Sequence, residues 1–146
     1  MPPSSLNFSI GMTPQGKDRP RFARTNNGAV RTYNTKKTQY AEQMIRVAWI
    51  EAGSVTLGEG AIELTIIAYL QRPKNHFRAS GQLSAAGERT PQPTKKPDAS
   101  NIAKLVEDAL NGCAWKDDSQ VVDLIVKKRW AFFGQDPHIK VVATTL

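Results

Sequence analysis

Acidic side chains gather in one short stretch of an otherwise basic chain. The 26 residues from Asp98 to Asp123 carry six acidic side chains against two basic ones, whereas the 146-residue chain carries 13 acidic and 20 basic residues. Carboxylates hold Mg²⁺, and Mg²⁺ in turn binds phosphate oxygens. Carboxylates clustered in a protein whose basic surface attracts a polyanion are therefore typical of a metal-dependent nuclease. A solvated acidic helix face explains the same pattern without any chemistry.

The acidic stretch predicts a helix over residues 100–111, followed by a strand. Apolar residues recur there at the spacing of one buried helix face: Ile102, Leu105, Val106, Ala109 and Leu110. At about 100° per residue, Asn101, Lys104 and Asp108 share a different stripe of the same helix. This second stripe is polar, and it leads from the residues before the helix toward the strand.

Acidic residues stand at both boundaries of this helix. Asp98 precedes the helix, and Asp117 and Asp118 follow it, just before the strand. Because the helix and the strand should pack as neighbours, we expect the two acidic elements to converge at one end of the pair. Plainer explanations also exist. Asp98 suits a helix N-cap, Lys104 with Asp108 suits a surface i, i+4 pair, and the paired aspartates suit a polar turn.

The rest of the chain predicts a small mixed α+β fold. Alternation and β-branched content predict strands at residues 6–10, 61–70, 121–132 and 139–145, and periodicity predicts helices at 36–52 and 100–111. No βαβ regularity appears. We therefore expect an α+β fold with a mixed sheet of about four strands and two main helices, in a single compact domain over residues 1–146.

Two basic segments lie outside the acidic stretch. Residues 14–46 carry eight basic and two acidic side chains, and residues 71–97 carry six basic and one. Residues 71–97 also hold four prolines and two glycines, which predicts a long basic loop without regular structure. Its charge favours a loop that lies along nucleic acid, and a variable surface insertion explains the composition equally well.

Several protein classes are excluded by what the sequence lacks. No run approaches the roughly 20 apolar residues of a membrane span, and the first residues lack the pattern of a secretory signal, so we expect a cytoplasmic protein without membrane contact. A single cysteine, Cys113, permits no internal disulfide, and only His76 and His138 accompany it as zinc ligands. The sequence contains no Gly-x-Ser-x-Gly motif, the nucleophile elbow that would indicate a serine hydrolase.

The acidic stretch resembles a known family. The pattern Lys-Pro-Asp-x-x-Asn-x-x-Lys, then Asp-Ala-Leu-Asn-Gly, then Trp-x-Asp-Asp-Ser-Gln-Val resembles the RusA family of Holliday-junction resolvases, found in bacteria and their phages. The core of the likeness runs from Lys95 to about Lys128. Weaker likeness in Arg19-Pro20-Arg21 and Arg72-Pro73-Lys74 extends it over most of the chain.

The resemblance implies a Mg²⁺-dependent, homodimeric endonuclease that cuts branched DNA at four-way junctions, without a small-molecule cofactor and with Mn²⁺ able to replace Mg²⁺. Asp98 and Asp118 match the family's essential aspartates, and Lys104 matches its essential lysine. The aspartates would hold the metal ion, with Asp117 as a further ligand or as a residue that orients Asp118. Lys104 would stabilise charge on the phosphate.

One position departs from the family. The best-known members carry an acidic residue where this chain has Ser100. A neutral hydroxyl is a weaker ligand than a carboxylate, so the site binds its metal more weakly or recruits Asp108 or Asp117. Asn101, on the same helix, is a further supporting residue of the site.

The resemblance also gives the basic segments a role as phosphate contacts, which position a protein on DNA without reading its sequence. The candidate contacts are Lys17, Arg19, Arg21, Arg24, Lys74, Arg78, Lys95, Lys96, Lys127, Lys128 and Arg129. Phe77 is a candidate wedge at the junction, although an aromatic anchor for its own loop is the more common role. Trp115 and Trp130 are candidates for the dimer interface.

Two alternatives remain open at this stage. A protein on the same scaffold that binds branched DNA without cutting it, for example in phage gene regulation, is favoured only by Ser100. An enzyme that cuts flaps or forks instead of four-way junctions would carry the same residues. Retention of Asp98, Lys104 and Asp118 argues against the non-cutting protein.

Overall fold

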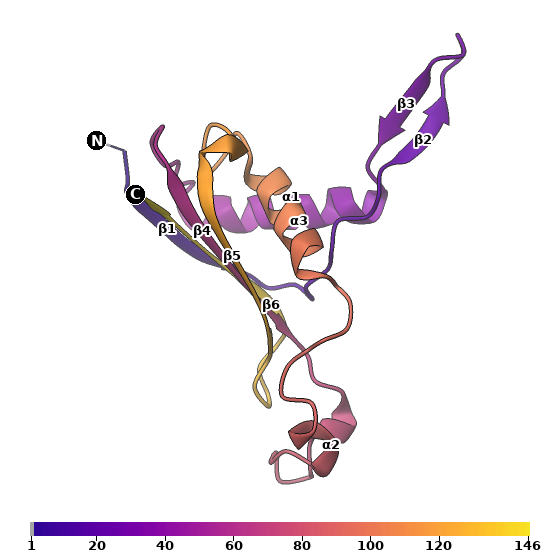
Figure 1. Cartoon of the computed structure of the whole chain (residues 1–146), viewed down its shortest axis with the longest axis vertical. Coiled ribbons are helices and arrows are strands. Elements are labelled where there is room, and N and C mark those ends of the chain that lie inside the picture. The colour runs from indigo at the N-terminus through magenta and orange to yellow at the C-terminus, as the bar shows by residue number, and fades with distance from the viewer. Residues whose placement is uncertain (1) are drawn as a thin grey trace.

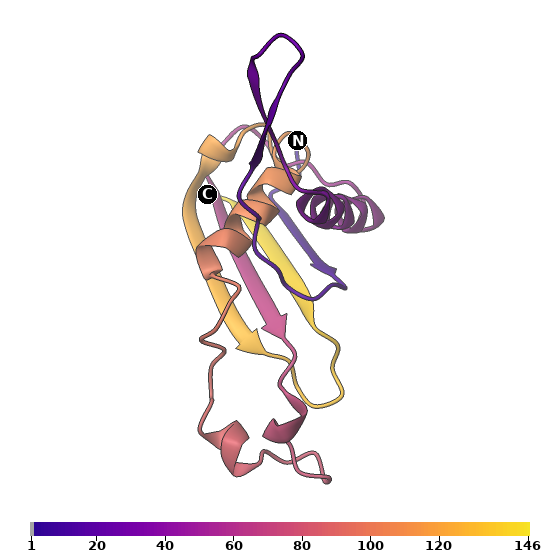
Figure 2. The same ribbon diagram turned by 90° about the vertical axis from the view of Figure 1, so that its right-hand side faces the viewer.

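A four-stranded sheet forms the centre of the computed structural model, which describes residues 2–146. Strand β1 (Ser5–Ile10) pairs antiparallel with β6 (His138–Thr145), β6 pairs antiparallel with β4 (Ile62–Leu70), and β4 pairs parallel with β5 (Val121–Trp130). The spatial order is therefore β1-β6-β4-β5, with β1 and β5 at the edges. Figure 2 shows this sheet nearly face-on behind the helices.

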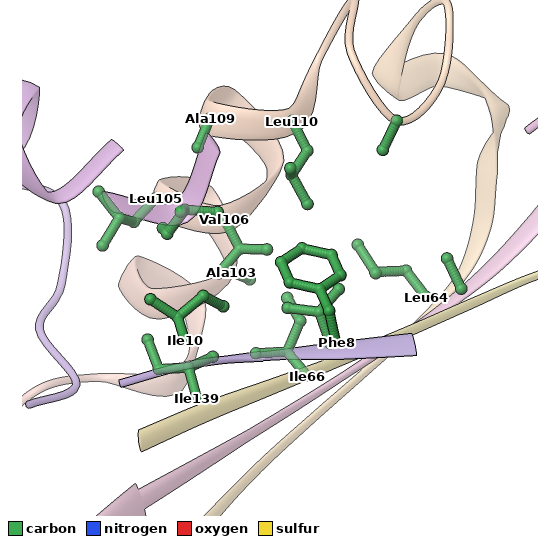
Figure 3. Packing of buried hydrophobic residues seen from close by; sticks show 14 of the residues in the cluster. Phe8, Ile10, Leu64, Ile66, Ala103, Leu105, Val106, Ala109, Leu110 and Ile139 are labelled. Carbon is green, nitrogen blue, oxygen red and sulfur yellow. The ribbon is translucent and has the colours of Figure 1, made fainter. Parts of the chain in front are cut away.

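Two helices, α1 (Lys36–Glu51) and α3 (Ala99–Leu110), cover one face of the sheet (Figure 1). The Thr35 hydroxyl caps α1 by accepting a hydrogen bond from the backbone N–H of Thr38. Helix α3 buries the whole predicted apolar stripe together with Ala103. Its side chains meet Phe8, Leu64, Ile66 and Ile139 of the sheet in one core (Figure 3).

The predicted fold class is confirmed, since the sheet is mixed, has four strands and packs against the two predicted helices. The predicted strands and helices match the observed ones to within about two residues at each end. The expected strand over 121–132 ends at Trp130, and a turn begins at Phe132, whose carbonyl oxygen accepts from the Gln135 N–H.

A β-hairpin was missed in the first basic segment. Strands β2 (Arg21–Arg24) and β3 (Val30–Tyr33) pair with each other and stand away from the rest of the molecule (Figure 1). The connecting turn contains Asn27-Gly28, and Gly28 adopts a φ of 82°, a left-handed conformation that glycine reaches without steric cost. Every side chain of both strands is exposed, so no apolar alternation marks them in the sequence.

The long basic loop expected over residues 71–97 has more regular structure than its composition predicts. The segment contains a 3₁₀ turn, η1 (Lys74–His76), and a short helix, α2 (Ala85–Glu88). The Ser84 hydroxyl caps α2 through the Gly87 N–H, and Gly87 itself packs so closely that a Cβ would lie 2.3 Å from the His76 carbonyl oxygen. These contacts fold the segment on itself at one end of the sheet (Figure 2).

Arg72 fastens this segment to the sheet. Its Nη1 donates hydrogen bonds to the carbonyl oxygens of Gly87 (3.0 Å) and Thr90 (3.2 Å), and its guanidinium lies 5.3 Å from the centre of the Trp130 ring. Trp130 also donates from Nε1 to the Thr90 oxygen, at 2.9 Å. Trp130 therefore anchors this segment, in a role that the sequence did not predict. Across residues 2–146 no helix is long and apolar enough to cross a membrane.

Candidate functional site

Helix α3 separates the two predicted metal ligands. Asp98 is the residue immediately before α3, and Asp118 lies beyond its other end, where the Asp118 backbone N–H donates to Asn111 Oδ1 at 3.1 Å. At a rise of about 1.5 Å per residue, the 12 residues of α3 place these ends about 18 Å apart. Since ligands of one Mg²⁺ lie about 2 Å from the ion, the two carboxylates of one chain do not share an ion. The expected convergence at one end of the helix is therefore wrong.

The amino end of α3 opens into a groove, which we call the amino-end groove. It has a volume of about 490 Å³ and is lined by Asp98, Asn101, Arg19, Lys37 and Lys96, with residues 14–18 along one wall. The Asp98 side chain is exposed and makes no capping hydrogen bond. The plainer explanation of Asp98 as a helix N-cap therefore does not apply. Cations and first-turn N–H groups together favour an anionic group here.

A close approach of the chain to α3 shapes this groove. The backbone N–H of Lys17 donates to the carbonyl oxygen of Asn101 at 3.1 Å. A Cβ at Gly16 would stand 2.8 Å from the Asn101 Cβ, so only glycine permits this contact. Ser100 is exposed in the first turn of α3, beside Asp98 and Asn101. Lys104 is exposed about one turn further along the helix.

Carboxylates gather at the other end of α3, in what we call the carboxyl-end cluster: Glu107, Asp108, Asp117 and Asp118. Burial raises the pKa of the Asp118 carboxyl, and the charges of Asp108 and Asp117 raise it further, against the hydrogen bond from Trp115. Burial likewise raises the pKa of Glu107, with Asp118 and Asp108 as additional causes. Like charges therefore repel one another in this cluster, and a bound cation would relieve that repulsion.

A buried tryptophan positions Asp118. Trp115 is fully buried in the core, and its Nε1 donates to Asp118 Oδ1 at 2.7 Å. The short 3₁₀ helix η2 (Asp118–Gln120) carries the aspartate and leads directly into β5. Because Trp115 has no exposed surface, it is not available for the dimer interface for which it was a candidate.

Asp117 has a separate structural task. Its side chain accepts from the backbone N–H of Ser119 and bonds the Ser119 hydroxyl, and Gln120 completes a capping box around it. These hydrogen bonds from Ser119 lower the pKa of Asp117. Its carboxylate is thus occupied in starting η2, which supports the role of a residue that orients Asp118.

An ion-pair network ties the cluster to α1. The Lys17 ammonium pairs with Asp108 and lies 4.0 Å from Glu42 Oε1. Glu42 is a buried residue of α1, and this same oxygen accepts no hydrogen bond from any described residue. Lys17 is therefore the cation between two carboxylates of different helices, and its charge is already paired within the chain. Glu42 and Glu107 were missed by the sequence analysis, although both are acidic residues on the two predicted helices.

The predicted phosphate contacts occupy four parts of the surface. Arg19, Arg21 and Arg24 lie at the base of the β2–β3 hairpin and along it, and Lys95 and Lys96 lie just before α3. Lys127 and Arg129 alternate on the sheet face away from the helices, opposite Ile67 and Tyr69 of β4. Lys74 and Arg78 belong to the folded segment 71–97. Lys128 is the exception, since its ammonium donates to the carbonyl oxygens of Lys95 (2.6 Å) and Pro97 (2.9 Å).

The donor chemistry of both ends of α3 suits a divalent cation. Asp98, Asp118, Glu107 and Asp108 offer carboxylate oxygens, the ligands that Mg²⁺ prefers. Within residues 2–146, however, no three side chains of His, Cys, Asp or Glu lie close enough together to hold a metal ion. One chain thus offers two separate groups of candidate ligands, one at the amino-end groove and one at the carboxyl-end cluster.

Carboxylates set among basic grooves and an arginine-bearing hairpin define a protein that acts on nucleic acid. Comparison with known proteins gives the family: the model of the endodeoxyribonuclease RusA family matches residues 11–143, and the chain belongs to that family. An uncharacterized protein, YqaN of Bacillus subtilis (strain 168), is 31% identical over 137 residues, which are 94% of this chain and 94% of that protein. The matched residues include both ends of α3 and the hairpin.

Proposed function

We propose that this chain is a Mg²⁺-dependent endodeoxyribonuclease that resolves four-way DNA junctions by paired symmetric cuts, acting as a homodimer, with Mn²⁺ able to replace Mg²⁺. The observation that carries the proposal is the division of the ligands between the two ends of α3, about 18 Å apart. Membership of the endodeoxyribonuclease RusA family supports DNA cleavage as the activity.

A second copy of the chain would complete each site. A two-fold axis relates the two copies, so every contact across the interface occurs twice. If one residue of the first copy contacts a second residue of its partner, that second residue of the first copy contacts the first residue of the partner. If Asp98 of one copy meets the carboxyl-end cluster of its partner, the dimer gains two complete ligand sets related by two-fold symmetry. A four-way junction has the same symmetry and needs two matched cuts, which makes this arrangement suitable for it.

Each residue of the proposed site would have a distinct task. Asp98 and Asp118 would hold the ion, and Asp117 and Trp115 would keep Asp118 in place. A bound Mg²⁺ would neutralise charge at the scissile phosphate and make an attacking water more acidic. Arg19, Lys37 and Lys96 would bind the phosphate backbone in the amino-end groove. Lys104, exposed on the same helix, would stabilise negative charge as it develops on the phosphate.

Complementation between two inactive variants tests the shared site. Asp98→Asn and Asp118→Asn are each expected to abolish cleavage of a synthetic four-way junction. When the two variants are mixed, unfolded and refolded together, about half of the dimers are mixed, and each mixed dimer regains one intact site. We therefore expect nicking of the junction, at about one quarter of the wild-type number of sites, without paired cuts.

The matched control mixes Asp118→Asn with a tagged copy of the same variant, which must stay inactive. Recovery of nicking only in the Asp98→Asn plus Asp118→Asn mixture would support a site shared between copies. If wild-type dimers cut the junction and mixed dimers, verified by their tags, never do so, both aspartates act within one chain and the shared site is refuted.

The second candidate is a branched-DNA-binding protein that does not cut. The observation that favours it is Ser100, an exposed hydroxyl beside Asp98 where the best-known resolvases carry an acidic residue. Tight binding of the junction without cleavage, in both Mg²⁺ and Mn²⁺, would favour this candidate. Cleavage of flaps or forks but not of four-way junctions would keep the chemistry and change the substrate.

A further inference from the structure

A surface of aromatic rings and cations lies at the end of the sheet far from Asp118. Asp118 lies at the start of β5 and Trp130 at its end, and ten residues of strand span about 30 Å. Two adjacent hollows, of about 460 and 760 Å³, open there between segment 71–97 and the turn that joins β5 to β6. Both are lined by Phe77, Phe132 and Phe133. We call this area the aromatic surface.

Phe132 is largely exposed, and no packing contact among the described residues explains why an aromatic residue stands at this position. Its side chain is 76% exposed, whereas aromatic residues normally bury most of their area. Phe133, 61% exposed, has a clear structural role, because its ring packs edge-to-face on Phe77 at 5.0 Å and covers Gly81. Phe77 thus anchors its own segment, and it is Phe132 that presents a free ring face at the mouth of both hollows.

Unpaired cations surround these rings. Lys74 and Arg78 line one hollow and Arg129 lines the other, and within residues 2–146 none of the three forms a salt bridge. The first hollow also includes one acidic side chain, Asp136. Arg129 is paired in register with Tyr69, whose ring stacks on His138 with centroids 4.5 Å apart. The surface therefore alternates flat rings with positive charge.

The aromatic surface is held in place by the packing beneath it. Arg72 joins Gly87 and Thr90, and Trp130 is fixed by its own hydrogen bond to Thr90 and by an edge contact with the buried His76, at 5.6 Å between ring centres. A rigid platform loses little conformational entropy when a ligand binds. The hollows are therefore a preformed feature of the fold.

We propose that the aromatic surface binds unpaired nucleotides of DNA, with a base stacked on Phe132 and its flanking phosphates on Lys74, Arg78 and Arg129. Every base has a flat face that stacks on an aromatic ring, and cations beside the ring bind the backbone, so such a surface holds single strands without reading their sequence. The inference rests on the proposed action on DNA, since branched DNA whose base pairs open where the arms meet exposes unpaired nucleotides. It does not depend on the metal site.

Charge decides between DNA and a second copy of this chain as the occupant. A two-fold contact through this surface would bring Lys74, Arg78 and Arg129 of one copy against the same cations of the other. Like charges that face one another in an interface oppose association. A polyanion meets the same cations favourably, and it releases counterions on binding.

Binding of single-stranded oligo(dT) tests the inference directly. We would measure the affinity of a fluorescent 12-nucleotide oligo(dT) by anisotropy, at fixed low salt and in EDTA so that no cleavage takes place. Phe132→Ala is expected to weaken binding by at least about fivefold, the loss of one base–aromatic stack. Phe132→Leu keeps an apolar side chain but removes the ring face, and it should weaken binding similarly, whereas Phe132→Trp should retain wild-type affinity.

Tyr40→Ala provides the matched control, because Tyr40 is an aromatic residue of α1 that is 65% exposed and lies outside the aromatic surface. It should bind oligo(dT) as the wild type does. A 2-aminopurine placed within the oligo(dT) should lose fluorescence on binding the wild type and keep it with Phe132→Ala, since stacking quenches this base. Thermal melting of each variant establishes that it is folded.

Two outcomes would overturn the inference. Unchanged oligo(dT) affinity in folded Phe132→Ala would show that the ring does not stack on bases. A shift of Phe132→Ala from dimer to monomer in sedimentation, with DNA affinity intact, would assign the surface to contacts between copies. Failure of the proposed nuclease function looks different: Phe132-dependent binding would persist while the wild type left four-way junctions uncut in Mg²⁺ and Mn²⁺.

Discussion

Replacing Arg72 with methionine should release segment 71–97 while leaving the core folded. The methionine keeps an apolar stem beside Trp130 but removes the Nη1 donor that binds the carbonyl oxygens of Gly87 and Thr90. A hydrogen bond from a charged donor contributes about 1.5–3 kcal/mol, so the two bonds contribute about 3–6 kcal/mol. The hydrophobic core of the described residues includes no residue of this segment. The substitution should therefore lower the free energy of local opening of the segment and leave the global stability of the core unchanged.

Hydrogen exchange measures that local opening. Among the amides that the folded segment protects are Ser84, bonded to the His76 oxygen at 2.9 Å, and Arg89, bonded to the Ala85 oxygen at 3.1 Å. A loss of about 3–6 kcal/mol corresponds to exchange about 10²- to 10⁴-fold faster, up to the limit at which the segment is open most of the time. Peptides from β4 and β6 should exchange at the wild-type rate.

Arg78→Met is the matched control, because the exposed Arg78 side chain makes no hydrogen bond with any residue of 2–146 and belongs to the same segment. It should leave exchange in the segment unchanged. Wild-type exchange of residues 73–92 in Arg72→Met would refute the assigned role of the guanidinium. Equal acceleration in β4 would show instead that the segment and the core unfold as one unit.

Three further results are expected. Asp118→Asn should abolish cleavage yet bind four-way junctions at least as tightly and melt within a few degrees of the wild type, because the amide oxygen can still accept from Trp115; cleavage at the wild-type rate would mean that the metal ligand is misassigned. Ser100→Asp should lower the Mg²⁺ concentration for half-maximal cleavage, and an unchanged titration would place Ser100 outside the ligand set. Junction affinity should fall steeply as salt rises, and a flat dependence would argue against the predicted phosphate contacts.

The sequence predicted the parts of the fold that hydrophobic periodicity controls. Helix α3 buries Ile102, Leu105 and Val106 because these residues recur at the helical period, and any packing partner must cover that face. The central strand β4 alternates buried and half-buried residues as its β-branched composition indicates. In these elements the hydrophobic pattern of the sequence agrees with the packing of the folded chain, so the pattern alone is enough to predict them.

The elements that were missed are held by contacts that composition does not express. Segment 71–97 has the prolines and charges of an unstructured loop, yet one arginine and one tryptophan bond its backbone. No sequence pattern predicts that Arg72 donates a hydrogen bond to the Thr90 carbonyl oxygen. The β2–β3 hairpin is different, because Asn27-Gly28 is a recognised hairpin signal that the sequence itself carries.

The sequence offers candidate site residues by type and spacing, but it did not predict how they are arranged. Asp98 and Asp118 were grouped because the helix and the strand that follow one another were expected to pack side by side. The 12-residue length of α3 already places its ends about 18 Å apart, so arithmetic on the sequence alone could have separated them. The roles of Trp115, Glu42 and Lys17 needed the folded chain, because each acts through a contact between distant segments.

Cleavage of a synthetic four-way junction, beside a linear duplex of the same sequence and in Mg²⁺ or EDTA, is the experiment to do first. We expect paired, symmetric cuts in the junction with Mg²⁺, none with EDTA and none in the linear duplex. Junctions that remain uncut in both Mg²⁺ and Mn²⁺ while the protein binds them tightly would contradict it. Equal cutting of the linear duplex would likewise contradict the assignment of a junction-resolving enzyme.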